Sequence, residues 1–213
     1  QRGLWFCSEE AEAAFEFYRR LPHTKGSKWS GVGFDLEPWQ KFIVGSILGW
    51  KREDGTRRFR YAWIEVARKN GKTTMLAPLG LYLLILDNEP GAEVYSVATK
   101  KDQAKLVYQA ARRMVLKSPD LLEVVKPYRD SLSVESTFSK FEALGADADT
   151  LDGLDPHGIL ADEVHKWKTR DLYDVMDTAT GARSQPLFAA ITTAGKQGNE
   201  TVYGQEHEFC RSF

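Results

Sequence analysis

The sequence lacks several features that would assign it to a class of protein at once. Only two of its 213 residues are cysteine, Cys7 and Cys210, and they lie near opposite ends without the spacing of metal ligands. This usage is typical of reduced thiols in a cytoplasmic protein and not of a disulfide-bonded secreted domain. The chain also has no charged-then-apolar leader, so we do not expect secretion.

Long apolar runs and a net charge are missing as well. The longest apolar stretch, residues 79–86, is far shorter than the ~20 residues that span a bilayer, so we expect no membrane partner. The formal net charge is −1, which excludes attraction of nucleic acid by the whole surface and requires local basic clusters for any contact with it. The sequence starts at Gln1 without methionine and ends at CRSF, which indicates a piece of a longer protein.

What the sequence does contain is an alternation of helix and strand signals. Ser8 is the predicted cap of a helix that Pro22 ends, and a polar loop follows at residues 23–33. Further helices are predicted at 37–50, 100–118 and 169–182, strands at 92–99, 158–164 and 186–194, an antiparallel pair at 131–136 and 139–146, and a hairpin at 51–66 that turns at Asp54-Gly55. Strands separated by helices of this length predict an α/β fold, a mostly parallel sheet covered by helices on both faces.

Residues 61–86 read YAWIEVARKNGKTTMLAPLGLYLLIL and contain the Gly-Lys-Thr ending of a phosphate-binding loop. The full pattern has another glycine five residues before Gly71, where this chain has Val66. Such a loop joins the end of a strand to the start of a helix, and this segment can supply all three parts. Lys72 would reach the β- and γ-phosphates and Thr73 would bind Mg²⁺. The alternative is an ordinary strand-turn-helix in which Lys72 is solvated. Pro78 lies inside the predicted helix and would bend it, because proline removes a backbone hydrogen bond.

A pair of carboxylates follows a short buried strand in GILADEVHKW, residues 158–167. In parallel α/β sheets, ligands bind where the strands end, so Asp162 and Glu163 are expected beside the phosphate loop. Asp162 would hold Mg²⁺, and Glu163 would orient and deprotonate the attacking water, with Glu65 as the next candidate for this base. The alternative is an acid pair that simply favours the start of a helix.

The order of these motifs points to one family. Asp-Glu-Val-His spells the box of one helicase superfamily, but helicases of that group carry an unaltered glycine-rich loop and a Ser-Ala-Thr segment. This chain instead has ITTAG at residues 191–195. Together, ARKNGKT, LADE and ITTAG closely resemble the ATPase domain of the large terminase subunit of tailed bacteriophages, the motor that packages DNA into procapsids. The resemblance spans roughly residues 36–195.

The resemblance implies an ASCE-type P-loop NTPase core at residues 36–213, preceded by a helical and loop extension at residues 1–35. Gln40 matches a glutamine that reads the adenine edge, and Arg68 matches a basic loop residue that senses the γ-phosphate and takes part in catalysis; for both, a plain surface residue is the alternative. The implied nucleotide-binding residues are Gln40, Arg68, Lys69, Asn70, Gly71, Lys72, Thr73 and Thr74. The implied coupling residues, which relay phosphate loss to DNA movement, are Thr192, Thr193 and Gly195, with the two threonines alternatively a strand-end pair. We interpret His165 as structural.

The resemblance also implies cofactors and partners. ATP and Mg²⁺ would be bound, and hydrolysis would drive double-stranded DNA into a procapsid, in the host cytoplasm at the portal. The implied protein partners are the portal protein, the small terminase subunit and further copies of this chain in a ring, with a monomer in isolation. The family's C-terminal nuclease domain is absent, so no DNA cleavage is expected. Two alternatives stay open: a superfamily 2 helicase or translocase, and a non-hydrolysing module for ring assembly.

One family arginine has no counterpart at the expected place. In some terminases an arginine before a glycine, shortly ahead of the acid pair, completes a neighbouring site, but this chain has Asp152 before Gly153. An aspartate cannot neutralise the charge that develops on the phosphoryl group. We consider Arg183 as the replacement, acting on the neighbouring subunit, with Arg68 acting in its own subunit as the rival and a plain surface arginine as the alternative for Arg183.

Two basic clusters are candidates for contact with DNA phosphates. The first is Lys100, Lys101 and Lys105, at the start of the predicted helix that follows the strand at 92–99. The second is Arg57, Arg58 and Arg60, beside the predicted hairpin. Solvated helix and loop surfaces are the alternative for both clusters. No base-reading module is evident, which suits a motor that moves any sequence.

Overall fold

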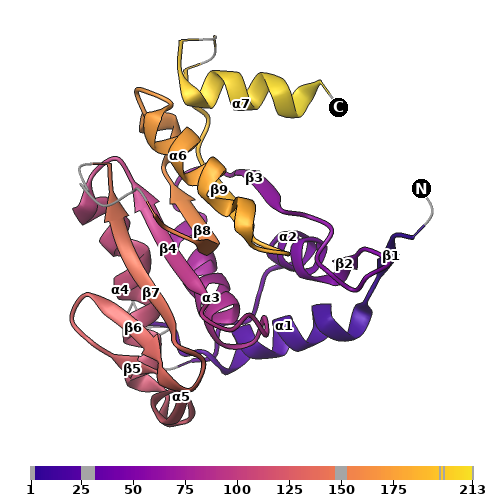
Figure 1. Cartoon of the computed structure of the whole chain (residues 1–213), viewed down its shortest axis with the longest axis vertical. Coiled ribbons are helices and arrows are strands. Elements are labelled where there is room, and N and C mark those ends of the chain that lie inside the picture. The colour runs from indigo at the N-terminus through magenta and orange to yellow at the C-terminus, as the bar shows by residue number, and fades with distance from the viewer. Residues whose placement is uncertain (1–2, 25–31, 147–152, 197, 199, 213) are drawn as a thin grey trace.

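The computed structural model describes residues 3–24, 32–146, 153–196, 198 and 200–212. Much of the polar loop predicted at residues 23–33 lies outside these residues. The main sheet has seven strands in the order β3-β9-β8-β4-β7-β6-β5 (Figure 1). The first five are parallel to one another: β3 (Tyr61–Glu65), β9 (Leu187–Thr192), β8 (Pro156–Asp162), β4 (Glu93–Ala98) and β7 (Ser139–Gly145). The last two, β6 (Ser131–Val134) and β5 (Lys126–Pro127), are antiparallel. The predicted mostly parallel α/β sheet is confirmed.

Helices cover both faces of this sheet, because the parallel strands are apolar on both sides. On β4, Val94 faces one core cluster and Tyr95 faces the other. The first cluster is covered by α3 (Lys72–Ile85) and α4 (Lys101–Lys117), with α1 (Ser8–Arg20) and α2 (Pro38–Gly49) packed outside α3. The second cluster is covered by α6 (Asp171–Ala179) and the start of α7 (Val202–Arg211).

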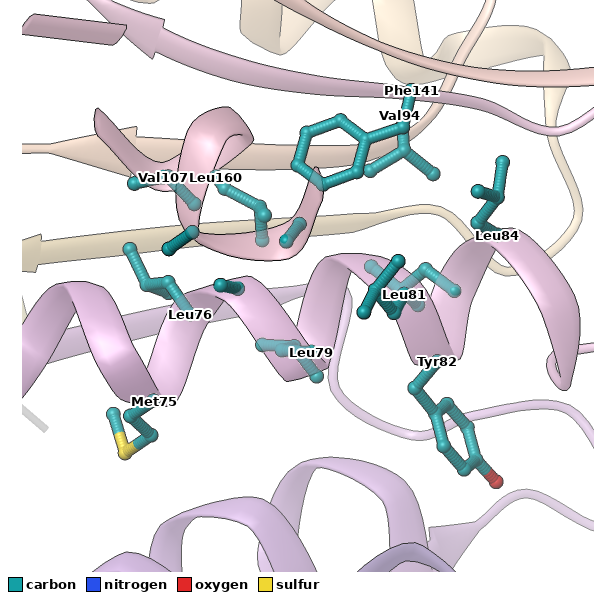
Figure 2. Close-up of a cluster of buried hydrophobic side chains, with 14 of the residues drawn as sticks. Met75, Leu76, Leu79, Leu81, Tyr82, Leu84, Val94, Val107, Phe141 and Leu160 are labelled. Carbon is teal, nitrogen blue, oxygen red and sulfur yellow. The ribbon is translucent and has the colours of Figure 1, made fainter. Parts of the chain in front are cut away.

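Helix α3 is buried between the sheet and the outer helices (Figure 2). Leu76 lies on its sheet side, towards Leu160, whereas Tyr82 points the opposite way. On that outer side the Tyr18 hydroxyl of α1 donates a hydrogen bond of 2.9 Å to the Met75 carbonyl. The helix continues through Pro78, because packing on both sides stabilises it more than the lost backbone hydrogen bond costs.

The predicted hairpin at residues 51–66 is wrong in its pairing. The turn at Asp54-Gly55 forms, with Gly55 at a φ of 81°, and Lys51 makes an isolated bridge to Arg57. However, β3 pairs in parallel with β9, and β2 (Trp50–Lys51) pairs with β1 (Trp5–Phe6) in a separate small sheet. A parallel neighbour more than 120 residues away in sequence gives no local signal, so the turn alone suggested a hairpin.

Other differences concern short or terminal elements. Cys7, and not Ser8, is the N-cap residue of α1. The sequence did not predict β1, β5, the short helix α5 (Pro119–Val124) or α7. Three single turns of 3₁₀-helix lie at Glu135–Thr137, Val164–Lys166 and Thr180–Ala182. Among the described residues, no helix combines the length and the apolar character needed to cross a bilayer.

Candidate functional site

The phosphate-loop sequence forms a turn between the end of β3 and the start of α3. Lys69 and Gly71 both have a positive φ, of 68° and 71°, and Gly71 is the N-cap residue of α3. Val66, which replaces the first glycine of the pattern, packs against the core, and its N–H donates to the Thr192 carbonyl at 3.0 Å. The site therefore uses this position to extend the pairing of β3 with β9, and the loop starts after it.

The first residues of α3 lie beside the end of β8, as the sequence predicted. Lys72 is buried, and its Nζ lies 3.7 Å from Glu163 Oε1 and 3.4 Å from the Val66 carbonyl. A cleft of about 490 Å³ opens over this junction. Its lining consists of Arg68, Lys69, Gly71, Lys72, Thr73, Thr74, Glu163 and Lys166. Five basic or hydroxyl side chains from the loop and helix thus share one cleft with a single carboxylate, a suitable arrangement for a triphosphate.

Asp162 is the last residue of β8 and is 2% exposed. Its Oδ1 has no hydrogen-bond partner among the described residues, and no cation there lies within ion-pair distance of this carboxylate. Burial, together with the neighbouring charge of Glu163, raises the pKa of Asp162 to about 6. A buried carboxylate without a partner is costly, and a bound cation would supply the missing interaction.

This donor set fits Mg²⁺. Across the residues described, no three or more His, Cys, Asp or Glu side chains gather into a complete metal site. Mg²⁺ does not need such a site, because it binds through one or two carboxylates together with phosphate oxygens and water. Asp162 and the hydroxyl of Thr73, at the adjoining start of α3, are the residues that would hold it.

Glu163 has a left-handed backbone, with a φ of 55° and a ψ of 40°. This conformation is unfavourable for a residue other than glycine, and such strain is found often at functional sites. The N–H of Glu163 donates to the Ile191 carbonyl at 3.0 Å. Its side chain lies beside two basic residues: Lys166 Nζ lies 2.8 Å from Oε2, and His165 Nε2 lies 3.5 Å from the same oxygen. Burial acts to raise the pKa of Glu163, but Lys166, His165 and Lys72 outweigh it and hold this pKa below its usual value.

The threonines at the end of β9 contact this carboxylate through His165. The Thr192 hydroxyl accepts a hydrogen bond from the His165 N–H and lies 3.0 Å from His165 Nδ1, and the Thr193 hydroxyl lies 3.3 Å from the same nitrogen. Burial lowers the pKa of His165, so the ring is neutral at neutral pH. A side chain at Gly195 would come within 2.8 Å of His165 and Tyr203. His165 is therefore the link between Glu163 and residues 192–195, a position that the sequence did not reveal.

Gln40 is buried at the start of α2, where its side-chain amide lies between the Glu37 backbone and the phosphate loop. Its Oε1 accepts a hydrogen bond of 2.9 Å from the Glu37 N–H, as part of the cap of α2. Its Nε2 faces the loop, 3.8 Å from where a side chain on Gly71 would begin. The structure thus places Gln40 against the phosphate loop and fixes its amide by capping, while its predicted contact with adenine stays a prediction.

Arg183 does not lie in the cleft. It precedes β9 and therefore lies at the opposite edge of the sheet, where the strands begin. Its guanidinium makes ion pairs with Glu89 at 2.8 Å and Asp155 at 2.9 Å and donates to the Gly91 carbonyl at 2.7 Å. A guanidinium that is bound by two carboxylates of its own chain is poorly placed to contact the nucleotide of a neighbouring subunit. This placement disfavours the predicted role of Arg183 in catalysis. Arg68 is exposed in the cleft, and Asp152 lies outside the described residues.

The arginines at residues 57, 58 and 60 make contacts within the chain, and only Arg57 is fully buried and withdrawn from the surface where DNA could bind. Arg57 is 1% exposed and pairs with Asp87 at 2.8 Å. Arg58 lies over the rings of Trp50 and Phe59, and Arg60 donates to the Arg183 carbonyl at 2.7 Å. These contacts fix the segment that leads into β3.

Glu65, the alternative base, is occupied elsewhere. The Tyr203 hydroxyl donates to it at 2.8 Å, and His207 Nδ1 lies 2.9 Å from its second oxygen. Both partners belong to α7, so this carboxylate attaches α7 to the strand that precedes the phosphate loop. Glu163 is the carboxylate that lines the cleft.

Comparison with known proteins gives a consistent result. The sequence profile of the family described as "Terminase large subunit, ATPase domain" matches residues 38–212. The large terminase subunit of Enterobacteria phage HK97 is 29% identical over 187 residues, which cover 85% of this chain and 36% of that protein. Protein YmfN of Escherichia coli (strain K12) is 46% identical over 57 residues, or 27% of this chain and 12% of that protein. The chain thus spans about a third of the length of the HK97 relative.

Solved structures agree. The crystal structure of the HK97 bacteriophage large terminase superposes with a TM-score of 0.80 and 26% identity, over 95% of this chain and 41% of that one. The ATPase domain of the large terminase of Thermus phage P74-26 superposes with a TM-score of 0.57 and 19% identity, over 78% of this chain and 67% of that one. At 19% identity, the second likeness is one of fold.

Proposed function

The chain belongs to the family of terminase large subunit ATPase domains, and from this premise we propose that its cleft binds and hydrolyses ATP to move double-stranded DNA into a procapsid. The observation that carries the proposal is the buried carboxylate of Asp162. It has an oxygen without a partner and lies next to Glu163, which reaches the phosphate loop through Lys72. Such a group is costly in a protein that binds nothing there.

In this proposal the loop residues hold the triphosphate. The backbone N–H groups of residues 69–73 and the start of α3 surround the phosphates, and Lys72 adds a point charge to the β- and γ-phosphate oxygens. Thr73 and Asp162 would hold Mg²⁺, and the ion would supply positive charge that neutralises the phosphate oxygens. Arg68, exposed at the rim of the cleft, stabilises the charge on the γ-phosphate. Gln40 contributes to the adenine end of the site.

Glu163 acts on the attacking water. Its strained backbone and its contacts with Lys72 and His165 fix the direction of the carboxylate. It accepts a proton as the water oxygen attacks the γ-phosphorus, while the bond from this phosphorus to the β,γ-bridging oxygen breaks and ADP leaves. A positioned base of this kind contributes about 10²- to 10⁴-fold in rate. A low pKa keeps the carboxylate ionised at neutral pH and ready to accept this proton.

His165 and β9 provide a route from chemistry to movement. When the γ-phosphate leaves, the charge around Glu163 changes, and the hydrogen bonds of His165 with Thr192 and Thr193 transmit this change to the end of β9. The chain then continues into α7, whose Tyr203 hydroxyl donates a hydrogen bond to Glu65 of β3. We infer that α7 moves with the state of the nucleotide.

The partners of the whole motor follow from the same premise. We propose that the domain acts with double-stranded DNA, the portal protein, the small terminase subunit and further copies of itself in a ring, in the host cytoplasm. Nuclease activity is not expected from residues 1–213.

Phosphate release, measured with and without double-stranded DNA, tests the proposal. We expect Mg²⁺-dependent hydrolysis that Lys72→Ala abolishes by removing Mg-ATP binding, with Lys117→Ala, at the end of α4, as a matched control. A chain that binds ATP but never releases phosphate, alone or with DNA, would support a module for ring assembly. Unchanged nucleotide affinity in Lys72→Ala would contradict the site itself.

A further inference from the structure

A second cleft, of about 380 Å³, adjoins the nucleotide cleft at the same edge of the sheet. It is lined by the residues that follow β4 and β7, by the segment between β8 and α6, and by α6 itself. Its charged residues are Lys100, Lys166, Lys168 and Asp171, which gives a formal local charge of +2. We call it the lysine groove, defined by Lys100, Lys166 and Lys168.

The lysine groove has the chemistry of a site for a phosphate backbone. Lys100 and Lys168 are exposed, and in the part of the chain that the structure describes neither makes an ion pair with a carboxylate. The aromatic side chain in the wall, Trp167, is 2% exposed, and its indole N–H donates to the Asp162 carbonyl at 3.2 Å. The groove thus offers cations, and it offers no open aromatic face on which a base could stack.

Lys166 lines both clefts. Its Nζ lies 2.8 Å from Glu163 Oε2 and is the nearer of the two lysines that contact this carboxylate, since Lys72 Nζ lies 3.7 Å from Oε1. The two side chains are 53% and 18% exposed, so the pair is open to solvent on the side of Lys166. An exposed ion pair of this kind is weak, and a nearby phosphodiester can compete for the lysine.

We propose that the phosphodiester backbone of double-stranded DNA binds in the lysine groove and draws Lys166 away from Glu163, which frees the carboxylate to act on water. The inference rests on the proposed ATPase function and adds a cause for DNA-dependent activity. Without DNA, Lys166 occupies Oε2, the oxygen that would otherwise accept the proton. With DNA, His165 and Lys72 still orient the side chain, so the base is released but not displaced.

The proposal predicts different effects for the shared lysine and the two outer ones. Lys166→Gln removes the inhibitory pair, so the rate of ATP hydrolysis without DNA rises about three- to tenfold and DNA adds little further. The double variant Lys100→Gln/Lys168→Gln keeps the pair but weakens DNA binding. The DNA concentration for half-maximal stimulation therefore rises about tenfold. Inorganic phosphate at millimolar concentration does not replace DNA, because a single small anion cannot contact all three lysines.

A matched control removes two charges elsewhere. Arg113, near the end of α4, and Arg129, 95% exposed between β5 and β6, lie outside the lysine groove. Arg113→Gln/Arg129→Gln should keep both the rate and its stimulation. If this control loses stimulation as much as the lysine double variant does, the effect is one of general charge and the groove assignment is wrong. The assignment is also wrong if Lys166→Gln lowers the DNA-free rate, or if inorganic phosphate stimulates as DNA does.

Binding of a short DNA duplex, followed by fluorescence anisotropy over a series of salt concentrations, tests the groove without catalysis. Loss of two phosphate contacts should reduce the slope of log affinity against log salt by about two in Lys100→Gln/Lys168→Gln. An unchanged slope would overturn the groove even if the chain hydrolyses ATP. Absence of hydrolysis in the wild type together with a reduced slope would instead contradict the ATPase proposal and the release of Glu163, while leaving the DNA-binding groove supported.

Discussion

At the amino edge of the parallel sheet, where the strands begin, buried and partly buried charged side chains pair with one another, whereas at the carboxyl edge, where they end, one buried carboxylate has no such partner. Arg57 and His157 share Asp87 at 2.8 and 2.5 Å, and Arg183 joins Glu89 and Asp155. Asp162 has no cation within ion-pair distance among the described residues.

The difference separates two uses of charge in one sheet. At the amino edge, the paired side chains connect loops that lie far apart in sequence, and breaking a buried pair leaves an uncompensated charge. At the carboxyl edge, Asp162 lacks a partner and Glu163 has a strained backbone, both of which reduce stability. The charged groups of the amino edge thus bind one another, whereas the carboxyl edge is arranged to bind a ligand.

The largest effect is expected from Glu163→Gln at the carboxyl edge. Glutamine keeps the shape of the side chain but cannot accept the proton from water, so turnover should fall by about 10²- to 10⁴-fold while ATP is still bound. Steady-state phosphate release and equilibrium nucleotide titration together measure the two quantities. Wild-type turnover in this variant would place the base elsewhere.

The next effect is expected at the amino edge, from Arg57→Ala. This change leaves Asp87 buried beside His157 without its guanidinium partner, and we expect the free energy of unfolding to fall by about 3 to 5 kcal/mol. Arg58→Ala, on the neighbouring residue whose side chain lies over Trp50 and Phe59, is the matched control and should cost less than half as much. Urea denaturation of both variants provides the comparison, and equal losses would show that the buried pair is not special.

Arg183→Ala tests whether the amino edge takes part in chemistry. Because its guanidinium is held by Glu89 and Asp155, we expect reduced stability but turnover within about twofold of the wild type, a change that is small beside the ~10³ contributed by an arginine finger. Subunits carrying Arg183→Ala, mixed with subunits carrying Glu163→Gln, should show no recovery beyond the sum of their separate rates. A rise in turnover on mixing would restore Arg183 as a residue that acts on its neighbour.

The smallest effect is expected in the dependence of stability on pH, through Asp87 at the amino edge. Burial acts to raise the pKa of Asp87, but Arg57 and His157 outweigh it and hold this pKa below its usual value. The stability that the ionised group contributes is therefore present above the unfolded-state pKa of about 3.9 and is lost as the pH falls through the lower folded-state value. Unfolding of the wild type and of Asp87→Asn, compared from pH 6 downwards, should show a difference that shrinks below about pH 4. A difference independent of pH would contradict this.

Short sequence motifs were sufficient to predict the residues of the site that lie in the phosphate loop and at the end of β8. The sequence predicted that Lys72, Thr73, Asp162 and Glu163 lie together, since each follows directly from a strand that ends at the same edge. The structure brings these residues together, and the family prediction is confirmed. The structure also explains Val66, whose N–H pairs with β9.

Contacts between distant segments could not be predicted in this way. The sequence shows that Arg57 and Arg183 are charged, but their partners lie 30 and 94 residues away, at Asp87 and Glu89. The positions of His165 and Lys166 depend on a single 3₁₀ turn that points them at Glu163. Helix α7 carries a weak helix signal, and its attachment to Glu65 bridges 138 residues of sequence.

Thermal unfolding of Asp162→Asn and Asp87→Asn, with and without Mg-ATP at pH 7.5, tests most directly whether the carboxylate of one edge binds a ligand and that of the other stabilises the fold. Since the pKa of Asp162 is raised to about 6, the ionised group costs stability above that pH. We expect Asp162→Asn to stabilise the free protein by roughly 2 to 4 kcal/mol and to lose most of the increase in Tm that Mg-ATP gives the wild type. Asp87→Asn should lower the Tm and keep that increase. A lower Tm for Asp162→Asn, or an undiminished increase with Mg-ATP, would contradict the account.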